Sequence, residues 1–298
     1  MGPLIGPAND RLARAFAELD PGERWLVEPR HLGDNLWSPG VRDDVRPGAW
    51  FHRTECFGPV LGLIHVPDLD AAIELVNSSE FGLTGGIHTL DPGEVERWME
   101  RVEVGNAYVN RPITGAIVQR QPFGGWKRSS IGPGAKAGGP NYVQQLGTWR
   151  EEPQGENDFA DEWDHHFSQE HDPTGLFCEA NVFRYRRLAR VGVWFGAEAE
   201  DRDRRLVDAA LGVVGTTRVE PGAGESLGAF AQRLGAAGVE RIRVVGGTPS
   251  DADRRAAATA GVHLATEPVS RFGRLELLHY VREQAVTRTF HRFGNLIT

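Results

Sequence analysis

The sequence predicts an α/β protein made of two successive units, each a mostly parallel sheet with helices packed on it. Its 298 residues correspond to roughly two domains of about 150 residues. Short apolar runs alternate with helical spacings of apolar residues over residues 60–110, and the alternation returns over residues 191–265. This alternation is typical of parallel sheets, because parallel strands need a crossover connection between them.

In the first unit we expect three strands, at residues 60–66, 85–90 and 107–110. The first of these is a short apolar run rich in β-forming residues. After Asp68, apolar residues recur at helical spacing and predict a helix that contains Leu69, Ile73 and Val76.

A second helix of the first unit has a clear start. Asp91 offers a side-chain cap, Pro92 suits the first helical position, and Glu94 adds a carboxylate in the first turn. The apolar stripe that follows predicts the buried face of this helix, formed by Val95, Trp98, Met99 and Val102. We expect the helix to end at Gly105.

The second unit repeats the pattern. We expect strands at residues 191–195, 217–219, 241–245 and 262–265, with helices between them. Near the end of the chain, residues 275–281 favour a helix and residues 285–290 alternate as a strand would. Gly246 and Gly247 could cradle a phosphate, but without a G-x-G-x-x-G pattern they favour an ordinary turn.

Between the units, residues 151–180 are acidic and contain no lysine or arginine, which predicts an extended linker. We therefore divide the chain into residues 1–150, a linker at 151–180 and residues 181–298. The linker carries histidines and aspartates whose irregular spacing favours a solvated run, so we expect no metal site. These residues are Asp161, Asp164, His165, His166 and His171.

Composition excludes several classes of protein. The formal net charge of −8 argues against a general nucleic-acid binder, which needs a basic face. No apolar run reaches the ~18 residues of a membrane span, and the first residues lack the features of a signal peptide. Two cysteines cannot form a disulfide framework, so we expect a cytoplasmic protein. We interpret both Cys56 and Cys178 as packing residues, because a carboxylate beside Cys56 raises a thiol pKa.

Two segments are candidates for ligand binding. In T-E-C-F-G-P-V, residues 54–60, Glu55 could accept hydrogen bonds from a ribose diol and Phe57 could press on a flat ring; the alternative is an exposed glutamate and a core phenylalanine. The second segment, residues 110–125, follows a strand at the end where open α/β sheets bind ligands.

The second segment has the features of an anion-binding loop. Gly115 allows close backbone approach, and successive amides in such a loop can form an anion-binding nest. Arg111 and Arg120 add positive charge nearby. The alternative is a structural loop with solvated arginines.

Several motifs resemble the carboxyl-terminal half of aldehyde dehydrogenases. They are E-C-F-G-P-V at residues 55–60, F-G-L-T-G-G at 81–86 and V-G-N-A-Y-V-N-R at 104–111. T-G-A-I-V-Q-R-Q-P-F-G-G at 114–125 and K-A-G-G-P-N-Y at 136–142 resemble the L-glutamate γ-semialdehyde (pyrroline-5-carboxylate) dehydrogenases of proline breakdown. R-E-Q-A at 282–285 and T-F-H-R-F-G-N at 289–295 resemble the tail domain of long bifunctional proline-utilisation enzymes.

The resemblance implies a fold and roles for individual residues. It implies part of an aldehyde dehydrogenase catalytic domain, with residues 141–149 as an oligomerisation strand, followed by a noncatalytic, Rossmann-like tail unit. Glu55 would hold the nicotinamide ribose of NAD, and Phe57 would lie beside the nicotinamide. The substrate is then a small aldehyde with a carboxylate, and the full enzyme a homo-oligomer. The residues implied to bind that substrate are Thr114, Gly115, Ala116 and Phe123.

The sequence departs from the family in its chemistry. The family uses a cysteine in a G-Q-x-C signature and a glutamate in an E-x-G-G signature, and neither occurs here. We therefore expect no catalytic residue in this chain, only the nicotinamide-ribose side of the cofactor site, and no activity of the chain alone. Three hypotheses remain open: a fragment of a dehydrogenase that lacks its amino-terminal half, one half of a split enzyme, or a nonenzymatic oligomerisation module.

Overall fold

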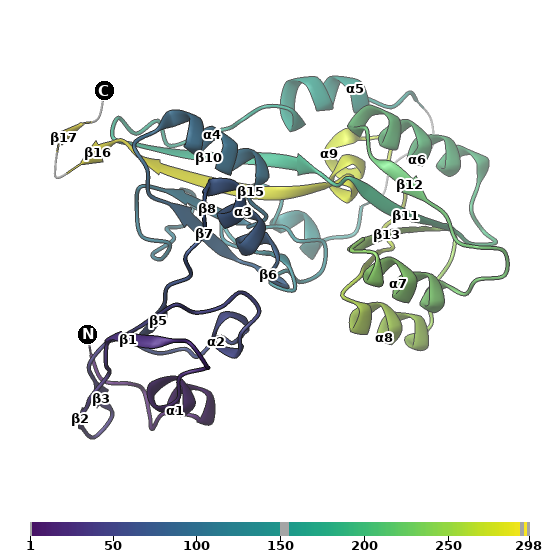
Figure 1. The fold of residues 1–298 in the computed structure, drawn as a ribbon. Coiled ribbons are helices and arrows are strands. Elements are labelled where there is room, and N and C mark those ends of the chain that lie inside the picture. The colour runs from purple at the N-terminus through teal and green to yellow at the C-terminus, as the bar shows by residue number, and fades with distance from the viewer. Residues whose placement is uncertain (1, 150–154, 293–294, 297–298) are drawn as a thin grey trace. The chain divides into compact units, whose positions relative to one another are not determined.

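The computed structural model describes residues 2–149, 155–292 and 295–296 (Figure 1). The chain forms two compact units, Met1–Ser79 and Glu80–Thr298, which are described separately below. From here on, these ranges are called the first and the second unit. Among the described residues, no helix combines the length and the apolar character needed to cross a bilayer.

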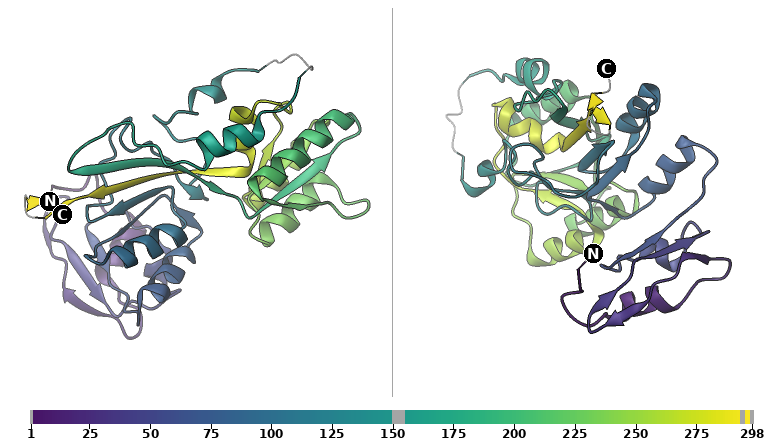
Figure 2. Two further views of the ribbon diagram at one scale, coloured as in Figure 1. Left: turned by 90° about the horizontal axis from the view of Figure 1, so that it is seen from above. Right: turned by 90° about the vertical axis from the view of Figure 1, so that its left-hand side faces the viewer.

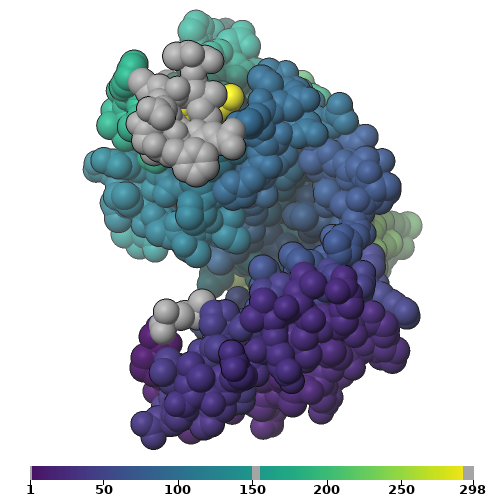
Figure 3. Space-filling model, turned by 60° about the vertical axis from the view of Figure 1, so that its left-hand side comes forward, coloured from purple at the N-terminus to yellow at the C-terminus, as the bar shows by residue number. Residues whose placement is uncertain are grey.

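The first unit contains a small mixed sheet and a hairpin, and its surface is coloured purple to blue in Figure 3. Strand β4 is the middle of the three-stranded sheet, antiparallel to β1 and parallel to β5, and β2 and β3 form the hairpin. The elements are α1 (Asp10–Ala17), β1 (Arg24–Val27), β2 (His31–Gly33), β3 (Leu36–Trp37), β4 (Gly40–Asp43), α2 (Trp50–Arg53), β5 (Val60–Gly62) and α3 (Leu69–Asn77).

Helix α1 anchors the core of the first unit. The Asn9 side chain caps it by accepting a hydrogen bond from the Leu12 amide at 3.0 Å. The buried face of α1 packs with Cys56, which confirms that this cysteine is a packing residue. Cys178 is exposed instead, so the same interpretation is wrong for that thiol.

The second unit contains two four-stranded sheets. Its elements before the acidic segment are β6 (Phe81–Gly82), β7 (Thr84–Ile87), α4 (Pro92–Arg101), β8 (Asn106–Val109), β9 (Trp126–Lys127) and the 3₁₀ turn η1 (Val143–Leu146). Those after it are α5 (Phe159–Glu162), the π-helical η2 (Trp163–Phe167), β10 (Glu179–Arg187), β11 (Arg190–Phe195), α6 (Asp201–Val214), β12 (Thr217–Val219), α7 (Leu227–Ala236), β13 (Arg241–Val245), α8 (Asp251–Ala260), β14 (His263–Ala265), α9 (Gly273–Glu276), the 3₁₀ turn η3 (Leu277–Tyr280), β15 (Val281–Thr289), β16 (His291–Arg292) and β17 (Asn295–Leu296).

One sheet is parallel throughout, in the order β12-β11-β13-β14, as the repeated alternation predicts. The side chains of its strands alternate between two apolar clusters, one on each face. Val191 and Val193 pack in the cluster of α6, whereas Ile242 and Val244 pack in the cluster of α7 and α8. The views in Figures 1 and 2 show helices on both faces of this sheet.

The other sheet joins early and late parts of the chain. Its order is β10-β15-β8-β7, with β15 antiparallel to β10 and parallel to β8. The sequence predicts β7 and β8, and Asp91 caps α4 through the Gly93 amide at 2.8 Å as expected. It does not predict β10, because Arg184, Arg186 and Arg187 interrupt the apolar alternation of that strand.

Three segments differ from the sequence-based expectations. The described part of the acidic segment is not an extended linker, because α5 and η2 bury Phe159 and Phe167 in the core of the second unit. Within residues 141–149, Val143–Leu146 form the turn η1, and no strand of the same chain pairs with the described residues there; an oligomerisation strand would pair with another copy and stays a prediction. Residues 275–281 divide between α9, η3 and the start of β15. Residues 150–154 of the acidic segment and 293–294 of the T-F-H-R-F-G-N motif lie outside the described residues.

Candidate functional site

The loop at residues 110–125 begins at the carboxyl end of β8, where sheets of this kind bind ligands. Asn110 begins the loop with a positive φ of 57°, a conformation that asparagine tolerates. Its side-chain amide pairs with the backbone of Thr89, donating to the carbonyl at 2.9 Å and accepting from the amide at 3.0 Å. The chain direction at the loop entrance is therefore fixed.

The middle of the loop offers free amides to solvent. Thr114, Gly115 and Ala116 are all exposed. Gly115 has a φ of +78°, and a Cβ added there would meet no atom within 4 Å. Across the described chain, the amides of Gly115 and Ala116 donate to no protein acceptor. Two adjacent free amides beside open space can bind a carboxylate oxygen.

A buried glutamine closes the loop behind these amides. The Gln121 side chain is 1% exposed, and its Oε1 accepts a hydrogen bond from the Ile117 amide at 2.8 Å. Its own backbone amide donates to the Ile117 carbonyl at 2.8 Å. Both bonds join the ends of one turn, which limits the motion of Gly115 and Ala116 just before it.

Asn106 and Lys136 form a buried polar cluster that supports the loop. Asn106 donates to the Pro122 carbonyl at 3.0 Å and accepts from the Gly124 amide at 3.1 Å. The Lys136 Nζ donates to Asn106 Oδ1 at 3.3 Å and to the Gly124 carbonyl. Burial lowers the pKa of Lys136 to about 7, and the attraction of Glu283 opposes part of this shift. This cluster holds the carboxyl-terminal end of the loop through the backbone of Gly124.

Phe123 lies at the edge of the loop and is 40% exposed. Its backbone pairs with Ala137 through two hydrogen bonds of 2.9 Å. An aromatic ring held in this way can flank an aliphatic chain. Thr114, Gly115, Ala116 and Phe123 therefore belong to one loop of the second unit, as the sequence predicts.

Glu55 and Phe57 lie in the first unit, in the segment between α2 and β5. Glu55 is exposed, and Phe57 is 83% exposed with a φ of +55°. Phe57 is therefore not the core residue of the alternative interpretation. Its positive φ is an unfavourable backbone conformation for a phenylalanine, of the kind that occurs often at functional sites.

Cys56, between these two residues, is a poor nucleophile. It is buried, and its Sγ donates to the Thr54 carbonyl at 3.6 Å. Burial raises the pKa of the Cys56 thiol, so the reactive thiolate is disfavoured.

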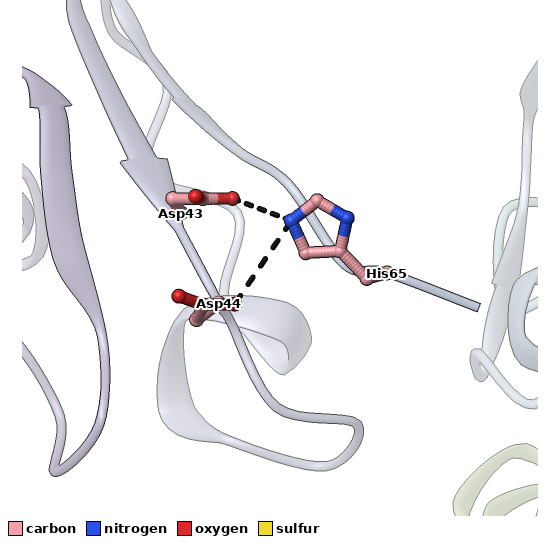
Figure 4. A group of neighbouring side chains, drawn as sticks. All are labelled: Asp43, Asp44 and His65. Carbon is pink, nitrogen blue, oxygen red and sulfur yellow. Dashed lines mark hydrogen bonds and ion pairs between the residues drawn. The ribbon is translucent and has the colours of Figure 1, made fainter.

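Asp43, Asp44 and His65 form the group of side chains shown in Figure 4, whose potential ligand atoms lie within 4.8 Å of one another. His65 Nε2 lies 2.7 Å from Asp43 Oδ1 and 3.9 Å from Asp44 Oδ1. Arg24 pairs with both carboxylates and offsets part of their negative charge. The hydrogen bond from His65, with the neighbouring positive charge, lowers the pKa of Asp43. The group is fully explained as an ion-pair network.

The residues that support the loop were not predicted from the sequence. Three of them, Asn106, Gln121 and Lys136, lie inside the motifs that carry the family resemblance. Their polar character gave no reason to expect that they are buried. A polar residue inside the apolar strand N-A-Y-V is a feature that could have identified Asn106, because buried amides need designated partners.

Comparisons with known proteins show what the chain is similar to. Residues 1–150 match the model of the aldehyde dehydrogenase family. The chain is 38% identical over 146 residues to 1-pyrroline-5-carboxylate dehydrogenase 2 of Bacillus subtilis (strain 168), covering 48% of this chain and 28% of that protein. It is equally similar, with the same coverage, to 1-pyrroline-5-carboxylate dehydrogenase of Geobacillus sp. (strain WCH70).

A solved structure matches nearly the whole chain. Proline utilization A from Corynebacterium freiburgense is 46% identical and superposes with a TM-score of 0.85. The match covers 99% of this chain and 32% of that protein. The chain thus spans about a third of this relative, and little more than a quarter of the two dehydrogenases.

Proposed function

The chain belongs to the aldehyde dehydrogenase family, and we propose that it forms part of an NAD-dependent dehydrogenase that oxidises L-glutamate γ-semialdehyde to glutamate. The names of the two dehydrogenases and of the proline utilization protein support this substrate class. The observation that carries the proposal is the loop at 110–125, whose free amides suit the carboxylate of such a substrate.

In this proposal the loop binds and orients the substrate. The amides of Gly115 and Ala116 donate to the carboxylate, Thr114 leads into this pair, and the Phe123 ring flanks the aliphatic chain. Fixed amides cost no reorganisation when the substrate binds, which is the advantage of a preformed site.

The segment around Glu55 and Phe57 would hold the cofactor. The exposed Glu55 carboxylate is free to accept hydrogen bonds from two ribose hydroxyls, and the exposed Phe57 ring presents a flat apolar face. NAD, when bound, supplies the acceptor for the hydride that leaves the aldehyde carbon. Both residues act by binding and orientation alone.

The chain is not expected to catalyse the reaction alone. Oxidation of an aldehyde in this family needs a thiolate and a general base, and the printed sequence lacks both the G-Q-x-C and the E-x-G-G signatures. The buried thiol of Cys56 cannot replace the first. Mixing the chain with NAD and pyrroline-5-carboxylate should therefore yield no NADH.

A chimera tests the proposal. This chain would replace the matched segment of the C. freiburgense protein, and NADH formation from pyrroline-5-carboxylate would be followed. We expect an active chimera that loses most of its activity with Glu55→Ala and retains it with Glu28→Ala, an exposed glutamate of the same unit. A folded chimera that binds neither NAD nor the aldehyde would refute the proposal.

A further inference from the structure

The described residues after 154 are called the tail here. Its first strand, β10, makes side-chain contacts with the loop at 110–125. Glu179, which begins β10, forms an ion pair with Arg111, with 2.9 Å between Glu179 Oε2 and Arg111 Nη1. The other oxygen of Glu179 accepts a hydrogen bond from Gln121 Nε2 at 3.4 Å. One carboxylate thus contacts the residues on both sides of the free amides.

Asn181, two residues further along β10, completes the contact. Its Oδ1 accepts from Gln121 Nε2 at 2.6 Å, and its Nδ2 donates to Glu179 Oε1 at 3.0 Å. Both Gln121 and Asn181 are 1% exposed, so water does not compete for these bonds. The side chain that closes the turn is therefore itself oriented by the tail.

We propose that Glu179 and Asn181 are positioning residues, which hold the carboxylate-binding loop in its binding conformation. This inference rests on the proposed function, because it assigns a purpose to the loop they hold. It makes the tail a part of the substrate site through these two side chains, although neither side chain touches the substrate.

The burial of the ion pair makes its contribution substantial. The side chains of Arg111 and Glu179 are 16% and 18% exposed, whereas those of Arg128 and Glu80, an ordinary surface pair, are each 64% exposed. Exposed ion pairs contribute little because water and salt screen them. The pair at the loop is screened much less, and its hydrogen bond is charge-assisted.

The two positioning residues are themselves held by the rest of the tail. Thr287 of β15 donates to Asn181 Oδ1 at 3.2 Å, and Asp172 accepts from the Asn181 amide at 2.9 Å. Asp172 also closes the turn before β10 by accepting from the amides of Thr174 and Gly175. Anchors fixed on a paired strand can impose a geometry on a loop, which free side chains cannot.

Space next to this contact allows the loop to move if it is released. A cavity of about 770 Å³ is lined by residues 118–120 of the loop and by the tail residues His166, His171, Thr174 and Asn181. Loss of the Glu179 carboxylate would leave Arg111 without its ion-pair partner, and the turn could then shift into this space.

Hydrogen exchange on the full 298-residue chain tests the positioning directly. The amides of Ile117, Arg120 and Gln121 are hydrogen-bonded within the turn and should exchange slowly. Glu179→Ala should accelerate their exchange about tenfold, the effect of losing about one charge-assisted hydrogen bond. Glu179→Gln, which keeps the shape and an acceptor oxygen, should give a smaller acceleration. Glu170→Gln is the matched control, because Glu170 pairs with Arg184 in the same tail without contacting the loop.

Kinetics of the chimera described above test whether the loop conformation held by Glu179 affects binding of the aldehyde. Glu179→Ala should raise KM for the aldehyde about tenfold while kcat and KM for NAD stay within about twofold. Unchanged exchange in Glu179→Ala would overturn the positioning role, and so would faster exchange with an unchanged KM. An inactive parent chimera would instead contradict the proposed function, while the exchange result would still decide whether Glu179 holds the loop.

Discussion

The two segments that we assign to ligand binding are held in opposite ways. Glu55 and Phe57 are exposed, and their segment is anchored by the buried Cys56 between them. The loop at 110–125 is also exposed at its centre, but it is held by the buried side chains of Gln121 and Asn106 and by the partly buried pair of Arg111 and Glu179. The first segment presents side chains, and the second presents backbone amides.

This difference follows from what each segment has to offer a ligand. A carboxylate or an aromatic side chain can find its partner by rotating about its own bonds. A backbone amide has no such freedom, so its direction must be fixed by the rest of the loop. We therefore expect mutations near the loop to affect stability and binding together, and mutations of the exposed segment to affect binding alone.

The largest effect is expected for Asn106→Ala. This change removes the partners of the Pro122 carbonyl and the Gly124 amide and one partner of Lys136 Nζ. Leaving buried groups unpaired should lower the free energy of unfolding by about 3 kcal/mol. Urea denaturation would measure it, with Gln145→Ala, an exposed amide of the same unit, as a control that stays within about 0.5 kcal/mol. Equal losses in the two variants would contradict the assigned support.

The next effect concerns the pH dependence of stability through Lys136. Folding lowers its pKa from 10.5 to about 7, so between these values the unfolded chain binds more protons at this position than the folded chain. The free energy of unfolding should therefore gain a contribution that rises with pH above about 7 and is constant below it. Subtracting the values for Lys136→Met at each pH from 6 to 9.5 isolates this contribution. A difference that does not rise with pH would show that Lys136 stays charged.

A second pH effect of the same sign, in the acidic range, is expected at His166. Burial, with the positive charge of Arg274, lowers its pKa from 6.5 to about 4, and it lies 3.0 Å from the Tyr185 hydroxyl. Its neutral form stabilises the fold above pH 6.5, and this stabilisation should be lost as the pH falls from 6.5 towards 4. His166→Gln should flatten this loss, and His165→Gln, an exposed neighbour, should not.

The smallest effect on stability is expected for the exposed segment. Glu55→Ala and Phe57→Ala should each change the free energy of unfolding by less than about 0.5 kcal/mol, because neither side chain is buried. Both should weaken binding of NAD in the chimera, measured by fluorescence quenching. A large loss of stability would mean that these residues support the fold, and the contrast with the loop would then fail.

Sequence patterns predicted local features well and distant contacts poorly. The cap at Asp91, the parallel strands and the loop after β8 depend on residues close together in the chain. Strand β10 depends on β15, with partners such as Glu179 and Thr289, and the Trp126 indole donates to the carbonyl of Glu283 across 157 residues. The buried roles of Lys136 and Gln121 involve Glu283 and Asn181, which are 147 and 60 residues away along the chain, so no local spacing reveals them.

The central claim is that the amides of Gly115 and Ala116 bind a carboxylate. The most direct test is to titrate the chain with glutarate, a dicarboxylate of the substrate's length, and to follow the amide resonances of both residues. We predict saturable shifts at these amides with glutarate and none with glutaramide, which has the same length without charge. Shifts of equal size with both compounds, or none at these amides with glutarate, would contradict the account.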